Sequence, residues 1–282
     1  MSPFDAARGG ALDKPGFAPH DDGLVEGEMT GELLERVLRR DRAVIAAALA
    51  ALALLCWAYL LRLAAAPAES MAAMAPELAR WTAADFLAML SMWWVMMVGM
   101  MVPAAAPMIL IYARVGRQAR ERGTPFAPAA WFALGYFLAW LGFALAATAL
   151  QWGLESALLL APGSARVAPR LGGALLVAAG LYQWSPLKDS CLRHCQSPMA
   201  FIQRHGFRGE RGAAVRLGLR HGAYCIGCCW LLMILLFAGG VMNLLWIAAI
   251  AALVLAEKLV AARLIQRVSG LALVAAGAAL AV

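Results

Sequence analysis

The chain has 282 residues, of which 63% are hydrophobic and 15% are charged, and its mean hydropathy is +0.72. So few charged residues cannot cover the surface of a soluble domain of this length, which excludes that class of protein. The net charge of +7 comes from basic residues between apolar runs, with no basic stripe interleaved with aromatic residues, so we assign no nucleic-acid partner.

The N-terminal segment is polar, with scattered glycine and proline, and shows no cleavable signal pattern. We predict a largely disordered cytoplasmic tail over residues 1–40, followed by a transmembrane helical domain over residues 41–282. Within this region, Glu32–Arg42 has the pattern of a short basic amphipathic helix that leads into the first span.

Seven apolar runs approach the length of about 20 residues that a spanning helix needs. The runs are continuous rather than alternating, which indicates helices and excludes a membrane β-barrel. The long second run contains Pro103 and Pro107, which are expected to kink it, and Gly239–Gly240 is expected to form a tight turn. The fold class is therefore an all-α polytopic bundle with spans at about 43–63, 83–112, 128–151, 170–185, 214–238, 241–258 and 265–282.

Lysine and arginine residues gather in alternate connections between these runs. They precede the first span, follow the second, fill the segment between the fourth and fifth, and lie between the sixth and seventh. The positive-inside rule then places the N-terminus in the cytoplasm and the C-terminus outside. We predict a multi-pass protein of the bacterial inner membrane in contact with the lipid bilayer. Six spans remain if residues 265–282 do not cross.

Two short stretches at the cytoplasmic ends of the fourth and fifth spans hold five of the six cysteines. Structural disulfides are disfavoured in that compartment, so metal binding or redox chemistry is the better interpretation. The first stretch has i, i+3, i+4 spacing, and the second places its ligands within a helical arc of about 100°. The candidate ligands are Cys191, His194, Cys195, His221, Cys225, Cys228 and Cys229.

Thiolate and imidazole ligands suit copper(I), zinc or iron, and we expect copper(I) first. Neighbouring Arg193 and Arg220 are expected to lower the pKa of the thiols. The alternative is that these cysteines only pack as small core residues. His20 and His205 are expected to be solvated rather than ligating.

The second span is rich in methionine, and Met96 and Met100 lie on one helical face with Pro103. Thioethers are soft ligands that hold copper(I) weakly, which suits transit, although methionine also fills irregular gaps in kinked bundles. Glu257 and Lys258 end the sixth span and form either an interfacial ion pair or a site where Glu257 handles ligand or protons.

Three blocks of this sequence resemble a bacterial family described as predicted metal-binding integral membrane proteins of unknown molecular function. The first block is W-W-V-M-M-V-G-M-M-V-P from Trp93, the second is C-L-R-H-C from Cys191, and the third is H-G-A-Y-C-I-G-C-C-W from His221. The likeness covers about residues 40–265 and includes every motif cysteine. It implies metal binding and a membrane location, and it supplies no substrate or reaction.

The predicted function is the handling or transport of a soft transition metal, copper(I) first, by the thiols and the methionine-rich helix. A metal chaperone or a membrane complex is the expected partner. One alternative is a membrane thiol–disulfide enzyme, because Cys225 and Cys228 form a C-x-x-C. Another is a zinc-stapled structural subunit. The sequence contains no motif of a known enzyme class, which favours a protein that is not an enzyme.

Overall fold

The computed structural model describes residues 22–65, 81–161, 165–206, 209–260 and 263–281, with side chains from residue 42 onward. The chain divides into two compact units, Met1–Asp41 and Arg42–Val282. Helix α1 (Asp22–Ala64) includes the predicted helical segment Glu32–Arg42. Residues 1–21 lie outside the described residues, so a disordered tail there stays a prediction.

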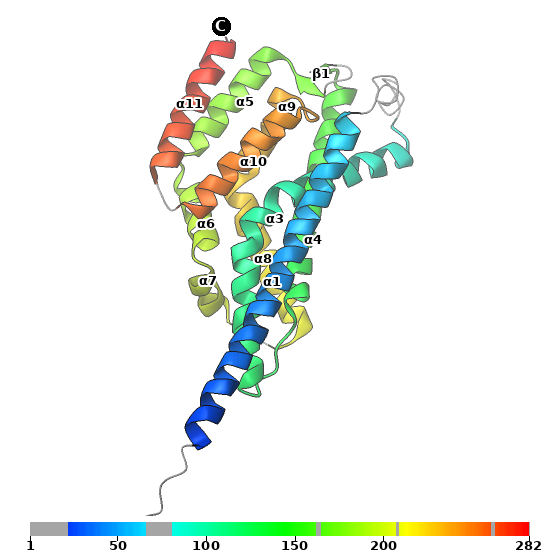
Figure 1. Cartoon of the computed structure of the whole chain (residues 1–282). Helices are drawn as coiled ribbons and strands as arrows, with labels where there is room; N and C mark the ends of the chain where they lie inside the picture. Colours follow the sequence, from blue (N-terminus) through cyan, green and yellow to red (C-terminus); the bar gives the residue numbers. More distant parts are fainter. Residues whose placement is uncertain (1–21, 66–80, 162–164, 207–208, 261–262, 282) are drawn as a thin grey trace, which may run out of the picture. The chain divides into compact units, whose positions relative to one another are not determined.

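The prediction of an all-α fold is confirmed, since the described residues are helical apart from connections and one two-stranded ladder (Figure 1). That ladder pairs β1 (Leu160–Ala161) with β2 (Arg166–Val167) in antiparallel register. After α1, the helices are α3 (Ala83–Glu121), α4 (Ala129–Ser156), α5 (Pro169–Tyr182), α6 (Pro186–Gln196), α7 (Pro198–His205), α8 (Arg211–Ile234), α9 (Leu236–Gly239), α10 (Leu244–Leu259) and α11 (Arg263–Ala281).

Five stretches of the described helices are long and apolar enough to cross a membrane. The predicted fourth and sixth spans do form helices, α5 and α10, but these have only 14 and 16 residues. Their crossing of a bilayer therefore stays a prediction. The five stretches are Arg42–Ala64, Ala83–Glu121, Ala129–Ser156, Arg211–Gly239 and Arg263–Leu280.

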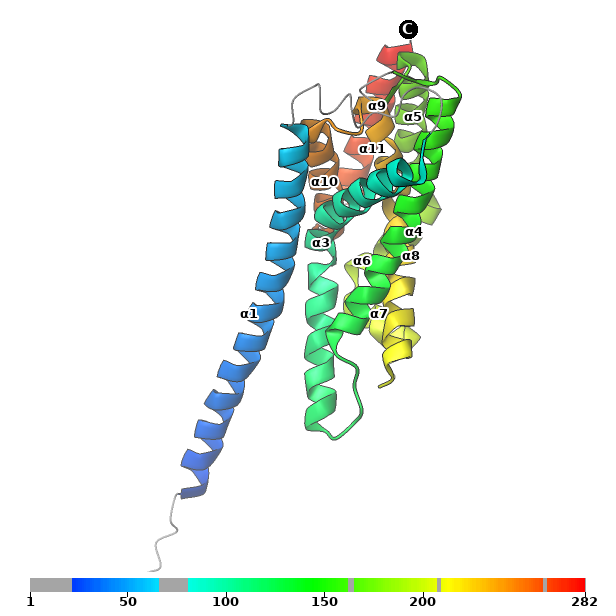
Figure 2. The same ribbon diagram turned by 90° about the vertical axis from the view of Figure 1, so that its right-hand side faces the viewer.

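Local signals explain where several helices begin and bend. Thr82 and Asp85 form a reciprocal capping box at the start of α3, and the Asn243 side chain accepts a hydrogen bond from the Trp246 N–H at the start of α10. Gly240 has a φ of 95°, which lets the chain turn between α9 and α10 as predicted. Pro103 and Pro107 lie inside α3, and Figure 2 shows this helix sharply bent along its length.

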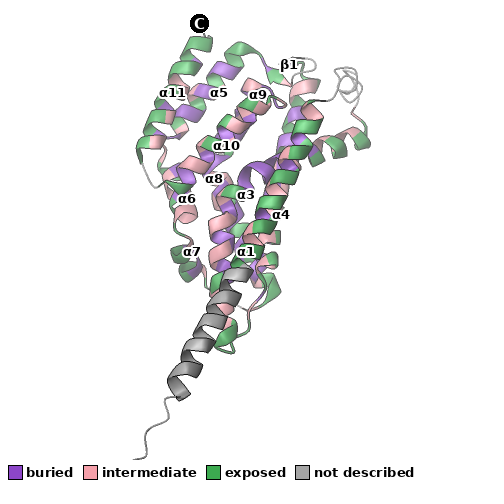
Figure 3. Cartoon of the chain, viewed as in Figure 1, coloured by how far each residue is buried: buried purple, intermediate pink, exposed green. Residues whose placement is uncertain are grey.

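Glycines set the close approach of α4 to α8. A Cβ atom added at Gly135 would lie 2.0 Å from the carbonyl oxygen of Val215, and one added at Gly218 would lie 2.0 Å from that of Phe132. Helices can approach this closely only where side chains are absent. Figure 3 shows buried residues along the inner faces of α3 and α8 and mainly exposed residues on α11. The tight α4–α8 pair brings Tyr136 of α4 to the cysteines of α8.

Replacing Gly218 by alanine is expected to destabilise the bundle by about 1–3 kcal/mol, because its methyl group would press on the α4 backbone rather than on a side chain that can move. The thermal unfolding midpoint in detergent checks this. The matched control is Gly142→Ala on α4, where an added Cβ meets no atom within 4 Å and no loss is expected. Equal midpoints for the two variants would contradict the close approach.

Candidate metal site

Three buried cysteines lie on the inner face of α8. The side chains of Cys225, Cys228 and Cys229 are only 1–2% exposed. The thiols of Cys228 and Cys229 both donate to the backbone carbonyl of Cys225, at 3.0 Å each. Their common face follows from the helical spacing, and the prediction that they lie together is confirmed.

Helix α6 adds two further thiols from the other predicted stretch. The Cys195 thiol lies beside the thiols of Cys225 and Cys228, and these neighbours together with burial raise its pKa well above the ordinary value. The Cys191 sulfur lies against α8, so that a Cβ at Gly227 would come within 2.8 Å of it. The structure thus joins both stretches in one thiol cluster, which we define as Cys191, Cys195, Cys225, Cys228 and Cys229.

The expected lowering of thiol pKa by neighbouring arginines is wrong for the thiols of α6. Burial raises the pKa of Cys191. Arg193 is largely exposed and lies 3.3 Å from the carboxylate of Asp189, and Arg220 is also exposed. These guanidinium groups face water, where their effect on a buried sulfur is screened.

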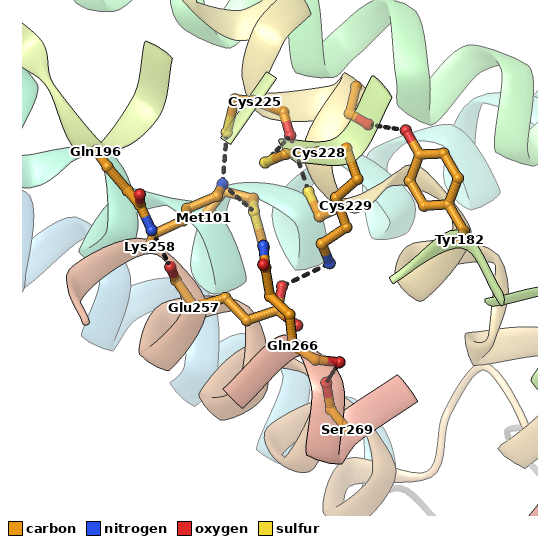
Figure 4. Close-up of polar contacts among 12 residues, drawn as sticks. Met101, Tyr182, Gln196, Cys225, Cys228, Cys229, Glu257, Lys258, Gln266 and Ser269 are labelled. Carbon is orange, nitrogen blue, oxygen red and sulfur yellow. Dashed lines mark hydrogen bonds and ion pairs between the residues drawn. The ribbon is translucent and has the colours of Figure 1, made fainter. Parts of the chain in front are cut away.

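A buried lysine supplies the positive charge at the thiol cluster instead. Lys258 of α10 is only 6% exposed, and its ammonium donates to the Cys225 sulfur at 2.8 Å. It also contacts the Met101 sulfur of α3 at 3.8 Å (Figure 4). The Tyr136 hydroxyl of α4 hydrogen-bonds with the same Cys225 sulfur at 3.1 Å. Side chains of α10 and α4 therefore contact Cys225 of α8, and α3 joins them through Met101 and Lys258.

Of the two alternatives for Glu257 and Lys258, an ion pair between them is not what the structure shows. Neighbouring residues on a helix project about 100° apart, and Glu257 instead meets Lys188 of α6 at 2.6 Å. Both side chains of this pair are at most 2% exposed. The Gln196 amide donates to the backbone carbonyl of Glu257 at 2.8 Å. This buried pair fixes α6 to α10 directly beside the thiol cluster.

The predicted histidines lie around the cluster rather than in its centre. His221 is 2% exposed and packs among the rings of Phe132, Tyr136 and Phe201. The His194 ring stacks on Tyr224 at a centroid distance of 4.1 Å. His205 was expected to be solvated, but it is only partly exposed, because its ring packs on Phe201.

The predicted methionines are buried, and a further methionine of α3, Met101, contacts the buried ammonium of Lys258. Met96 and Met100 are 0% and 2% exposed and belong to the same apolar core as the cysteines of α8. Met101 reaches Lys258. Sequence reasoning therefore found the methionine helix, but it missed Met101, Tyr136 and Lys188 as neighbours of the site.

Within the described residues, no three histidine, cysteine, aspartate or glutamate side chains are arranged to hold a metal ion. The hydrogen bonds explain this, because Cys228 and Cys229 direct their thiols at the backbone carbonyl of their own helix. Binding a soft metal ion requires these side chains to rotate about χ1 and lose their protons. The donor set of several thiols and a nearby thioether fits such an ion.

The described part of the chain is thus a bundle of apolar helices with a cluster of buried thiols between them. Residues 90–280 match the family PpoB2, whose description is copper chaperone, and the chain belongs to this family. The matched range contains the whole thiol cluster and Lys258. The predicted relation to a metal-related family is thereby confirmed. No curated protein and no solved structure matches the chain.

Proposed function

We propose that the protein is a multi-pass protein of the bacterial inner membrane that takes copper(I) as cargo on the cytoplasmic side and passes it on. The observation that carries this proposal is the convergence of thiols from α6 and α8 beside one buried ammonium group. Cys225 and Cys228 are the first two ligands, and Cys191, Cys195 and Cys229 are within the same cluster. The description of the family as copper chaperones supports the choice of metal.

Exposed apolar side chains support the membrane location. Leu245 is 82% exposed, Leu54 is 70% exposed and Leu264 is 69% exposed, and each lies on a helix of a predicted span. A soluble protein rarely leaves so many large apolar groups in water, whereas lipid chains accommodate them. The basic connections between the helices support the predicted cytoplasmic N-terminus.

Charge balance favours a monovalent ion at the thiol cluster. Two thiolates with one copper(I) ion carry a net charge of −1, and the Lys258 ammonium on Cys225 neutralises it. A zinc ion held by four thiolates would carry −2 and leave a net charge buried in an apolar core, which is costly. The site therefore suits copper(I) better than zinc.

The methionines of α3 offer the next ligands along the bundle. Met101 lies beside Lys258, and Met100, Met97 and Met96 continue the buried side of the helix. Thioethers bind copper(I) more weakly than thiolates, so they suit an ion that moves on. A cytoplasmic metal chaperone would deliver the ion to the thiols, and an acceptor in or beyond the membrane would receive it.

Copper binding by protein purified without oxygen or chelator tests the proposal. The wild type is expected to bind copper(I) tightly, and Cys225→Ser/Cys228→Ser is expected to lose that tightly bound ion. The matched control is Cys56→Ser, which removes a buried cysteine of α1 outside the thiol cluster and is expected to bind as the wild type does. Tight copper that survives in the double variant would refute the proposal. Zinc at about one ion per chain would favour a structural staple instead.

A further inference from the structure

Two histidines on neighbouring helices lie together next to the thiol cluster. His194 is near the end of α6 and His205 is the last residue of α7, and the centres of their rings are 6.4 Å apart. Both side chains are partly exposed, so a solute can reach them. Cys195, which follows His194 on α6, belongs to the thiol cluster and lies beside thiols of α8.

Each of these rings is held by one nitrogen and leaves the other free for a ligand. His194 Nδ1 donates to the backbone carbonyl of Ser190 at 2.8 Å, and His205 Nδ1 donates to that of Phe201 at 3.0 Å. A metal-ligating histidine characteristically donates its second ring N–H to a carbonyl, which fixes the tautomer and turns the other nitrogen to the metal. The two histidines share this arrangement, with Nε2 as the remaining donor.

The separation of the rings suits one shared ion. An imidazole nitrogen lies about 2 Å from a bound first-row metal ion, so two rings that hold one ion between them have centres about 6 Å apart. The observed 6.4 Å is close to this value. Copper(I) accepts two nitrogen ligands, whereas zinc in proteins takes four ligands.

A cavity beside His205 provides access. It has a volume of about 220 Å³ and is lined by His205, Gly206, Arg216 and Arg220 among others. Two arginines disfavour a free cation but attract an anionic carrier, such as a copper(I) thiolate complex. The carrier would rest in this cavity while its ion passes to His205, which lines the cavity, and to His194, which precedes Cys195 on α6.

We propose that His194 and His205 form a second copper(I) site, an entry site that receives the ion from an anionic thiolate carrier and passes it to the thiol cluster. The inference rests on the proposed function, because the ion and its destination are those of the thiol cluster. It assigns to His205 a role in metal binding through Nε2, shared with His194. The exchange replaces carrier thiolates by imidazoles and then imidazoles by cysteine thiolates of the cluster, with no change in oxidation state. The protons that the cluster thiols lose are balanced by those that the released carrier thiolates take up.

Titration of the full chain in detergent with copper(I), against a chromophoric copper(I) chelator and without oxygen, tests the entry site. The wild type is expected to bind two ions, one tightly and one weakly. His205→Ala and His194→Ala are each expected to lose the weak ion and keep the tight one. The matched control is Gln203→Ala, an exposed residue of α7, which is expected to keep both. Circular dichroism and size-exclusion profiles confirm that the variants are folded.

The outcomes separate the entry site from the proposed function. Cys225→Ser/Cys228→Ser is expected to lose the tight ion and keep the weak one, with nitrogen rather than sulfur neighbours in its copper X-ray absorption spectrum. A His205→Ala variant that binds both ions like the wild type would overturn the entry site. A wild type that binds only one ion would also overturn the entry site. If the cysteine variant then loses that single ion, the proposed function stands. A tight ion retained in the cysteine variant would instead overturn the proposed function.

Discussion

Replacing Lys258 by methionine is expected to weaken copper(I) binding about 10- to 150-fold. The Lys258 ammonium donates to the Cys225 sulfur at 2.8 Å in a site that is almost closed to water. A hydrogen bond to a charged group contributes about 1.5–3 kcal/mol, and about 1.4 kcal/mol corresponds to tenfold in affinity. Without the ammonium, a copper(I) ion held by two thiolates leaves a net negative charge in the apolar core.

Competition with a chromophoric copper(I) chelator measures the affinity of each variant. The matched control is Arg263→Met, which removes a cation whose side chain is 73% exposed, and we expect little change from it. Because methionine is itself a soft ligand, Lys258→Leu serves as a second test of the lost charge. Unchanged affinity in both Lys258 variants would show that the ammonium does not balance the charge of the bound ion.

Replacing Lys188 by methionine is expected to destabilise the bundle by about 3–5 kcal/mol, because it leaves the carboxylate of Glu257 charged and buried without its partner. The second oxygen of this carboxylate, Oε1, already has no hydrogen-bond partner among the described residues. The double variant Lys188→Met/Glu257→Met removes both charges and is expected to recover most of the loss.

Unfolding in detergent, followed by circular dichroism, compares the wild type with the single and double variants. Arg193→Met on the same helix is the control, since its ion pair with Asp189 is largely exposed and a surface pair contributes about 0–1 kcal/mol. A double variant as unstable as the single one would mean that packing of the lysine stem, rather than its charge, holds α6 to α10.

Periodicity in the sequence predicted the helices of the bundle and part of the site. The apolar runs matched α3, α4 and α8 closely, since a backbone that cannot bond to water must bond within its own helix. The common face of Cys225, Cys228 and Cys229 followed from 3.6 residues per turn. The bend at Pro103 and the turn at Gly240 could also be predicted, because proline and glycine act on the backbone locally.

Periodicity in the sequence could not predict which partners the charged and polar side chains contact. Glu257 pairs with Lys188, 69 positions away in the sequence, and Tyr136 meets Cys225 across 89 positions. Neither the sequence around Glu257 nor that around Tyr136 predicts these contacts. The same holds for His205, whose ring lies near His194 because the last turns of α6 and α7 come together.

The sequence by itself determined that this chain is helical and apolar and that thiols from two stretches are candidate soft-metal ligands. Only the tertiary structure decided that Lys258 donates to Cys225 while Glu257 pairs with Lys188, and that Met101 contacts Lys258. The physical reason is that helix formation depends on bonds between residues close in the chain. Which helices touch depends on close approaches such as that of Gly135 and Gly218, where absent side chains let α4 and α8 meet.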